Sequence, residues 1–223
     1  MKKITKIAVA AAMLSAVPAA VQAGGIGLYV PYTLSHSADL TYDAYSIATQ
    51  EHPKEDIEYK YSGSGIGFVY DSNLDDKKSN INWRTGFEYV KMEWDSADGR
   101  SIDAKAADIK RYSIVETMGF RIWDNDMFRV WAGPRIGLFY QTVKSSPGYS
   151  YGYEDSSLGA NVAGVLGMNM NIGEHFTLSA DVDYSAGFVT GGWEWDLSDE
   201  TENFTGTENG ATLKVYALWR FGK

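Results

Sequence analysis

Apolar residues recur at every second position through most of the chain after residue 23. Near the C-terminus, Leu213, Val215 and Ala217 alternate with Lys214 and Tyr216. A period of two is typical of β-strands with one apolar side and one polar side. Eight rows of this kind can be traced, at 26–34, 66–70, 81–89, 112–122, 128–140, 158–172, 176–188 and 211–221. The pattern predicts an all-β fold with eight antiparallel strands.

Most of these rows are longer than the strands of soluble β-sandwiches, which usually have about 5–6 residues. A strand that crosses a bilayer needs about 9–11 residues. Lipid offers no hydrogen-bond partner to an unpaired backbone group, so a membrane-spanning sheet has to close on itself. We therefore expect a closed antiparallel transmembrane β-barrel.

The links between the rows differ in length. The long links are 35–57, 95–107, 145–156 and 191–209, and they alternate with shorter links at 71–80, 124–127 and 173–174. Membrane barrels have short turns on the periplasmic side and longer loops outside. We therefore expect both chain ends on the periplasmic side and four extracellular loops.

Three residues interrupt the rows. Glu116 falls at an apolar position of the fourth row, so we expect a β-bulge to shift the register there. Pro31 and Pro134 cannot donate a ladder hydrogen bond, so each should mark a kink or a bulge.

The first 23 residues have the composition of a secretory signal peptide. Lys2, Lys3 and Lys6 precede an apolar stretch, and a small-residue motif at 21–23 precedes the expected cleavage before Gly24. The apolar stretch is shorter than the roughly 20 residues of a transmembrane helix. We predict a signal peptide at 1–23 and an outer-membrane β-barrel domain at 24–223.

The full chain has 20 basic and 29 acidic residues and a formal net charge of −9. Without the three lysines of the predicted signal peptide the balance is 17 against 29, which gives −12. This excess of negative charge disfavours nucleic acid and anionic lipid as electrostatic partners. The sequence contains no cysteine, which excludes disulfides and thiolate metal sites.

With these features the chain resembles the superfamily of small outer-membrane barrels that includes the opacity proteins and the transmembrane domain of outer membrane protein A. Residues from Lys214 to Phe221 are similar to the family's assembly signal, a polar residue followed by spaced aromatic residues ending in Phe. They depart from it at Tyr216, where glycine is usual, and in the trailing Gly222 and Lys223. The resemblance implies a monomer in the cell outer membrane, assembled by the barrel assembly machinery and surrounded by outer-membrane lipid and lipopolysaccharide.

The inward positions of the rows pair bulky side chains with glycines. An eight-stranded barrel is only wide enough for its own side chains to fill. We therefore expect a plugged interior, with at least one ion pair between Asp181 or Asp183 and Lys214 or Arg220, and a narrow polar channel is the alternative. The bulky residues are Arg84, Arg129, Trp131, Arg135 and Arg220, and the glycines are Gly25, Gly63, Gly65, Gly67, Gly133 and Gly137.

None of the candidate motifs contains a complete set of catalytic or ligand-binding residues. The glycines from Gly63 to Gly67 alternate within a strand and lead into no helix, so they do not form a phosphate loop. His36, in the first predicted loop, is followed by Ser37 and Asp39 and resembles loop residues of the lipid A palmitoyltransferases. That family begins with an amphipathic helix, whereas this chain enters its first strand directly. We assign no catalytic, cofactor-binding or metal-ligating residue and expect no enzymatic activity.

The predicted loop 191–209 has six acidic residues and neither lysine nor arginine. A calcium site needs six to eight converging oxygens, and the spacing here fits no known calcium loop, so we expect these charges to be solvated. The acids are Glu194, Asp196, Asp199, Glu200, Glu202 and Glu208.

The expected function follows from location rather than from a site. The favoured hypothesis is a structural or surface-interaction protein that displays four extracellular loops to an unidentified extracellular ligand. The first alternative is a narrow small-solute pore. The second is a lipid A-modifying enzyme.

Overall fold

The structure is a computed structural model that describes residues 24–43, 54–72, 74, 79–101, 107–145, 153–195 and 201–221. The predicted signal peptide at 1–23 lies outside these residues. Within the described ranges, no helix is long and apolar enough to cross a membrane.

The described residues form nine strands in one antiparallel sheet. The strands are β1 (Gly25–Asp43), β2 (Lys54–Asp71), β3 (Ile81–Ala97), β4 (Arg100–Ser101), β5 (Ala107–Asp124), β6 (Phe128–Ser145), β7 (Tyr153–Ile172), β8 (Phe176–Trp195) and β9 (Thr201–Arg220). The short β4 pairs antiparallel with the last residues of β3. The other eight follow the order β2-β1-β9-β8-β7-β6-β5-β3, and β3 pairs again with β2. The predicted closed ring of eight antiparallel strands is confirmed.

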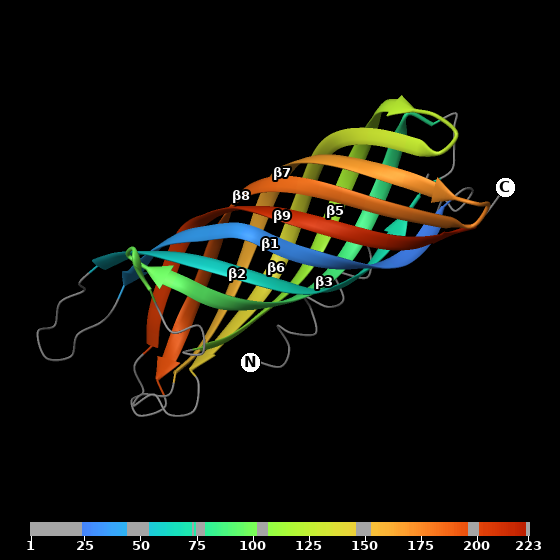
Figure 1. Ribbon diagram of the computed structural model, residues 1–223. Helices are drawn as coiled ribbons and strands as arrows, with labels where there is room; N and C mark the ends of the chain where they lie inside the picture. The colour runs from blue at the N-terminus through green and yellow to red at the C-terminus, as the bar shows by residue number, and fades with distance from the viewer. Residues whose placement is uncertain are drawn as a thin grey trace, which may run out of the picture.

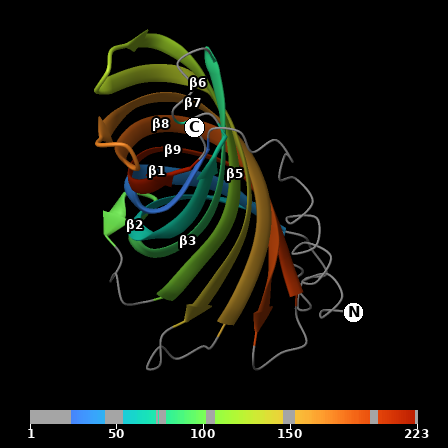
Figure 2. The ribbon, with the colours of Figure 1, turned by 90° about the vertical axis from the view of Figure 1, so that its right-hand side faces the viewer.

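The strands run obliquely along the barrel (Figure 1) and lie side by side around one ring (Figure 2). The two described chain ends meet at one end of the barrel, where the amide of Phe221 donates a hydrogen bond to the carbonyl of Gly24 at 2.8 Å. We call this the turn end. The opposite end, where β1 ends at Asp43 and β9 begins at Thr201, is the loop end.

Both tight turns predicted from the sequence are present at the turn end. Between β5 and β6, Oδ1 of Asn125 accepts hydrogen bonds from the amides of Met127 (2.9 Å) and Phe128 (2.7 Å). Between β7 and β8, Gly173 has a φ of 60°, a left-handed conformation that favours glycine. These local interactions fix the reversal of the chain at the two turns.

The strands extend further toward the loop end than the sequence pattern predicted. The eight long strands have 17 to 20 residues each. Most of 35–57, predicted as the first loop, belongs to β1 and β2. Most of 191–209, predicted as the last loop, belongs to β8 and β9. The connecting loops are therefore shorter than predicted.

In the parts of the strands nearer the loop end, apolar side chains face the lumen and polar side chains face outward, which is the reverse of the arrangement near the turn end. In the first half of β3, Trp83 is exposed on the outer face and Arg84 is buried in the lumen. In the second half, Met92 and Trp94 are buried in the lumen and Glu93 between them is exposed. An apolar outer face is compatible with lipid, whereas a polar outer face is compatible with water. The loop-end part of the barrel therefore lies outside the membrane.

The apolar outer face near the turn end forms a band around the barrel, which we call the apolar belt. Its side chains are exposed to the surroundings of the barrel rather than to the lumen. The belt includes Leu28, Val30, Tyr32, Ile66, Phe68, Trp83, Phe120, Ile136, Leu138, Leu158, Val162, Leu166, Val182, Tyr184, Val215 and Trp219.

The bulge predicted at Glu116 does not occur. The ladder between β3 and β5 is continuous from Ile81 to Met92 and includes the pair Thr85–Glu116. Glu116 therefore remains on the outer face, where the hydroxyl of Thr85 donates a hydrogen bond to its Oε2 at 3.0 Å. This hydrogen bond gives the carboxylate a polar partner on the outer face, so no bulge is needed to turn Glu116 into the lumen.

The two prolines do not shift the register either, which corrects the expected bulges. Pro31 and Pro134 each take part in an unshifted ladder with a neighbouring strand. A proline removes one donor from the ladder, and this loss requires no extra residue. The register shifts instead between Thr33 and Ser35 in β1 and between Arg121 and Trp123 in β5.

Candidate functional site in the barrel lumen

The part of the lumen nearer the turn end contains a network of buried charges. Arg84 of β3 forms ion pairs with Asp71 Oδ2 of β2 (2.9 Å) and Asp181 Oδ2 of β8 (3.3 Å). Arg135 of β6 binds the same oxygen of Asp181 at 3.0 Å and also pairs with Asp183. We call this network the polar plug, and its charged members are Asp71, Arg84, Glu88, Arg135, Asp181, Asp183 and Lys214.

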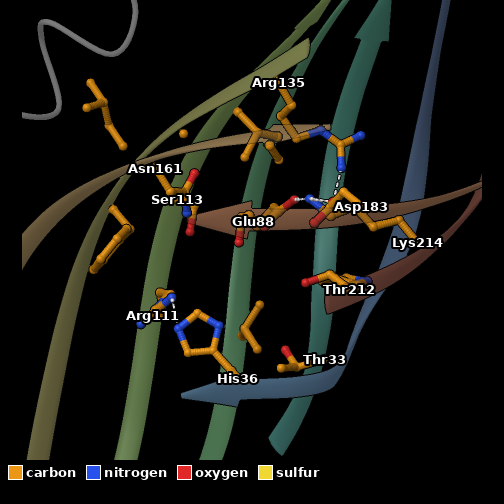
Figure 3. A pocket seen from close by; sticks show the side chains of 18 of the residues that line it. Thr33, His36, Glu88, Arg111, Ser113, Arg135, Asn161, Asp183, Thr212 and Lys214 are labelled. Atoms are coloured by element: carbon orange, nitrogen blue, oxygen red, sulfur yellow. Dashed lines mark hydrogen bonds and ion pairs between the residues drawn. The ribbon is translucent and has the colours of Figure 1, made fainter. Parts of the chain in front are cut away.

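Lys214 of β9 joins the plug to a third acid. Its Nζ pairs with Glu88 and lies 3.8 Å from Oδ2 of Asp183 (Figure 3). The predicted ion pair between β8 and β9 is confirmed. The closer partner of Asp183 is Arg135, which reaches it from a strand that is not adjacent to β8.

Aromatic rings fill the space between these charges. The ring centres of Tyr29 and Tyr216 are 4.7 Å apart, and the guanidinium carbon of Arg84 lies 4.5 Å from the centre of Tyr216 and 5.0 Å from that of Trp131. Gly67 makes room for this packing, because a Cβ at that position would lie 2.2 Å from the ring of Tyr29. The expected plugged interior, with bulky residues facing glycines, is confirmed.

An apolar residue covers the base of the plug. Leu74, from the link 72–80 between β2 and β3, is 1% exposed and clusters with Tyr29, Val69 and Leu218. This link is longer than a tight turn, and the extra length carries a side chain into the lumen. The sequence pattern did not indicate this role.

Above the plug lies a cavity of about 60 Å³. In Figure 3, Glu88, Arg135 and Lys214 of the plug lie on one side of it, and His36 and Arg111 lie on the other. The volume is sufficient for a few water molecules. It is a small polar chamber rather than a continuous water column.

A second group of charges, which we call the girdle (His36, Arg111, Gln141 and Glu208), lies on the other side of this cavity. Arg111 donates to both oxygens of Glu208, at 2.8 Å and 3.3 Å, and to Oε1 of Gln141 at 3.0 Å. Nε2 of His36 lies 3.1 Å from Oε2 of Glu208. His36 and Glu208 were predicted in loops, and both are lumen residues because β1 and β9 continue past the apolar belt.

Beyond the girdle, the loop end of the lumen is lined by apolar and aromatic side chains. The ring centres of Tyr42 and Phe204 are 5.5 Å apart, as are those of Tyr59 and Trp94. A cavity of about 20 Å³ remains among these side chains. We call this region the aromatic chamber, and its lining includes Leu40, Tyr42, Tyr59, Tyr61, Trp94, Val143, Asp155, Ser157, Val189 and Phe204.

Asp155 is a buried acid in this largely apolar chamber. The residue is 3% exposed, and neither its Oδ1 nor the hydroxyl of Ser157 has a hydrogen-bond partner among the described residues. Asp155 lies on the loop-end side of Leu158, the first belt residue of β7, and therefore outside the membrane. Burial raises the pKa of Asp155 to about 7.

The residues that resembled a lipid A-modifying site do not come together. His36 faces the lumen, whereas Ser37 and Asp39 lie on the outer face of β1. The hydroxyl of Ser37 donates to Oδ1 of Asn209 at 3.2 Å. This geometry provides no nucleophile beside His36.

The remaining motifs have simple structural explanations. The glycines from Gly63 to Gly67 lie within β2, as predicted. Of the six acids at 191–209, Glu208 belongs to the girdle, and the side chains of the other five lie outside the described residues. In the part of the chain that the structure describes, no group of three or more histidine or acidic residues is placed to hold a metal ion.

A closed ring of eight antiparallel strands with an apolar belt and a lumen filled by polar side chains defines the class of small outer-membrane β-barrels. The outer membrane protein OprG from Pseudomonas aeruginosa has a similar structure, with a TM-score of 0.59 and 13% identity over 91% of this chain and 97% of that chain. The outer membrane protein AlkL, solved in lipid bilayers, gives a TM-score of 0.50 and 11% identity over 93% and 95%. No protein-family model and no curated protein sequence matches the chain. At these identities the likeness shows the fold.

Proposed function

We propose that the protein is a closed structural barrel of the outer membrane that presents its loop-end rim to the exterior for surface interactions. The observation that carries this proposal is the blocked lumen. In the polar plug, the side chains of Arg84, Arg135 and Asp181 are at most 3% exposed. A solute would have to break these ion pairs before it could pass.

Below the aromatic chamber the girdle forms a second barrier. Arg111 and Glu208 are joined by two hydrogen bonds across the lumen, and the ring of Phe139 lies 4.1 Å from the guanidinium carbon of Arg111. A narrow pore, which is the alternative function, would need both the girdle and the plug to rearrange. The closed barrel requires no such change.

The outer wall beyond the apolar belt supports the surface role. Its side chains are polar and charged, and strands rather than loose loops hold them in place. Nζ of Lys60 lies 3.5 Å from Oε1 of Glu58, and Nζ of Lys91 lies 4.0 Å from Oδ1 of Asp108. Exposed ion pairs of this kind contribute little to stability. Such residues are available to contact an external partner.

We also propose that the barrel has no enzymatic activity. The support is that the candidate histidine lies in the girdle, bound to Glu208, while the nearby serine and aspartate face the opposite side of the strand. Mass spectrometry of lipid A from cells that express the protein tests this point. A modified lipid A that disappears in the His36→Ala variant would contradict it.

The main experiment is electrical recording from the purified full-length protein in planar lipid bilayers. We expect no regular conductance steps from the natural protein. In a variant with both Arg84→Ala and Asp71→Ala, which removes a plug ion pair without changing the net charge, steps should become more frequent or larger. Steady steps from the natural protein that are unchanged in this variant would overturn the closed-barrel proposal in favour of a pore.

A further inference from the structure

The unpartnered acid in the aromatic chamber suggests a ligand. The acids of the polar plug and the girdle are all within ion-pair distance of a lysine or arginine. Asp155 has no such neighbour among the described residues, although it is 3% exposed. Burying a carboxylate without a partner is unfavourable. A cationic ligand at this position would pair with the carboxylate and so stabilise the barrel.

Ser157 provides a second acceptor beside the acid. Alternate residues of a strand point to the same side, so Asp155 and Ser157 both face the chamber. Both have a buried oxygen without a hydrogen-bond partner in the described part of the chain. A single group that carries a positive charge and several N–H donors would satisfy both oxygens.

The size of the chamber restricts which cation fits. Its cavity of about 20 Å³ is close to the space of one water molecule. A primary ammonium group is about that size and has three N–H donors. A quaternary ammonium is larger and has none, and Ca²⁺ would need six to eight oxygen ligands. The aromatic rings also favour an organic cation, because the face of a ring attracts positive charge.

We propose that the aromatic chamber binds the ammonium group of primary alkylamines, hydrogen-bonded to Asp155 and Ser157 beside Leu40, Val143 and Phe204, while the alkyl chain extends out of the cavity toward the loop end. These three side chains are apolar and line the same cavity. The girdle forms the floor of the site, and its acid is already bound to arginine. Because the polar plug closes the lumen beyond the girdle, the amine enters and leaves through the loop end. This ligand site goes beyond the proposed surface role.

Calorimetric titration of the purified full-length protein with n-butylammonium chloride tests the proposal. We expect saturable binding in the millimolar range or tighter, and no binding of tetramethylammonium or n-butanol at equal concentration. Asp155→Asn keeps the size of the side chain but removes its charge. It should weaken amine binding at least about tenfold, the effect of losing one charge-assisted hydrogen bond. Ser157→Ala should give a smaller loss.

Asp39→Asn is the matched control, because Asp39 is an exposed acid on the outer face near the loop end and its replacement changes the net charge equally. It should leave the affinity unchanged. Circular dichroism and the faster gel migration of unheated barrel confirm that each variant is folded. Equal amine affinity in the natural protein and Asp155→Asn, equal binding of tetramethylammonium, or no saturable binding would each overturn the proposal and leave ordered water as the occupant. Because binding is measured without conductance, its failure would not affect the closed-barrel proposal.

Discussion

Replacement of Arg135 by methionine is a direct test of the polar plug. The side chain of Arg135 is 3% exposed and has several polar partners at once. Its Nη2 binds Asp181 at 3.0 Å, its Nη1 pairs with Asp183, and its Nε donates to the hydroxyl of Thr117 at 2.7 Å. Methionine has a similar length and no charge, so Arg135→Met removes the ion pairs while it largely preserves packing.

The expected loss follows from the partners left behind. Asp181 would keep Arg84 at 3.3 Å, but Asp183 would keep only the more distant contact with Lys214 at 3.8 Å. Breaking a buried ion pair by removing one partner typically costs about 3–5 kcal/mol, because the remaining charge stays buried. We expect Arg135→Met to lower the free energy of unfolding by about 3–5 kcal/mol.

Urea unfolding in detergent micelles, followed by tryptophan fluorescence, measures this difference. The control is Arg100→Met, which removes an exposed arginine from β4 and should change stability by less than about 0.5 kcal/mol. Addition of Asp183→Asn to Arg135→Met should recover part of the loss, because it removes the stranded charge. Equal unfolding midpoints for Arg135→Met and Arg100→Met, or no recovery in the double variant, would refute the assignment of these partners.

Two further predictions concern single positions. Burial raises the pKa of Asp155 from 3.8 to about 7, so the natural protein should lose stability as pH rises between these values, and Asp155→Asn should be more stable by up to about 4 kcal/mol at pH 8 but similar at about pH 4. A difference that is the same at both pH values in urea unfolding would contradict this. Gly67→Ala should destabilise by about 1–3 kcal/mol because its Cβ would meet the ring of Tyr29, whereas Gly164→Ala, which has no atom within 4 Å, should cost less than about 1 kcal/mol in the same assay.

The strands and the plug could be predicted because they depend on local alternation and barrel width. A row such as Leu178, Ala180 and Val182 identifies both faces of β8. The acids at the alternate positions, Asp181 and Asp183, then have to face the lumen. The narrow width of an eight-stranded barrel then predicts the ion pairs, because inward arginines have no space except against inward acids. This reasoning requires no knowledge of register.

The particular partners could not be predicted in the same way. Arg111 and Glu208 are 97 residues apart in sequence, and they meet because of the stagger between strands around the whole ring. Alternation shows which residues face the lumen but not their height in it. For the same reason, the pairing of Arg84 with both Asp71 and Asp181 follows only from the three-dimensional register.

The aromatic chamber was missed for a different reason, although its signal is present in the sequence. In β3 the apolar residues change from odd to even positions at Val90, and the charged Lys91 and Glu93 then occupy the outward positions. A search for one continuous apolar row ends at this change and interprets the remainder as loop. The change marks the level at which the surroundings of the strand turn from lipid to water.

The reversal of polarity also explains why Asp155 is informative. Inside the membrane-spanning part, the outer face supplies the apolar surface and buried charges can be arranged in pairs within the lumen. Outside it, the barrel is surrounded by water, so the lumen has to supply the apolar core, and Met92, Ile109 and Phe139 provide it. An unpaired acid destabilises such a core, because its charge is buried and it forms no ion pair. Positions where a sequence departs from the rules of its own fold are expected at functional sites. Asp155 is such a position, and the loop end of the lumen is therefore where a ligand of this barrel should be sought.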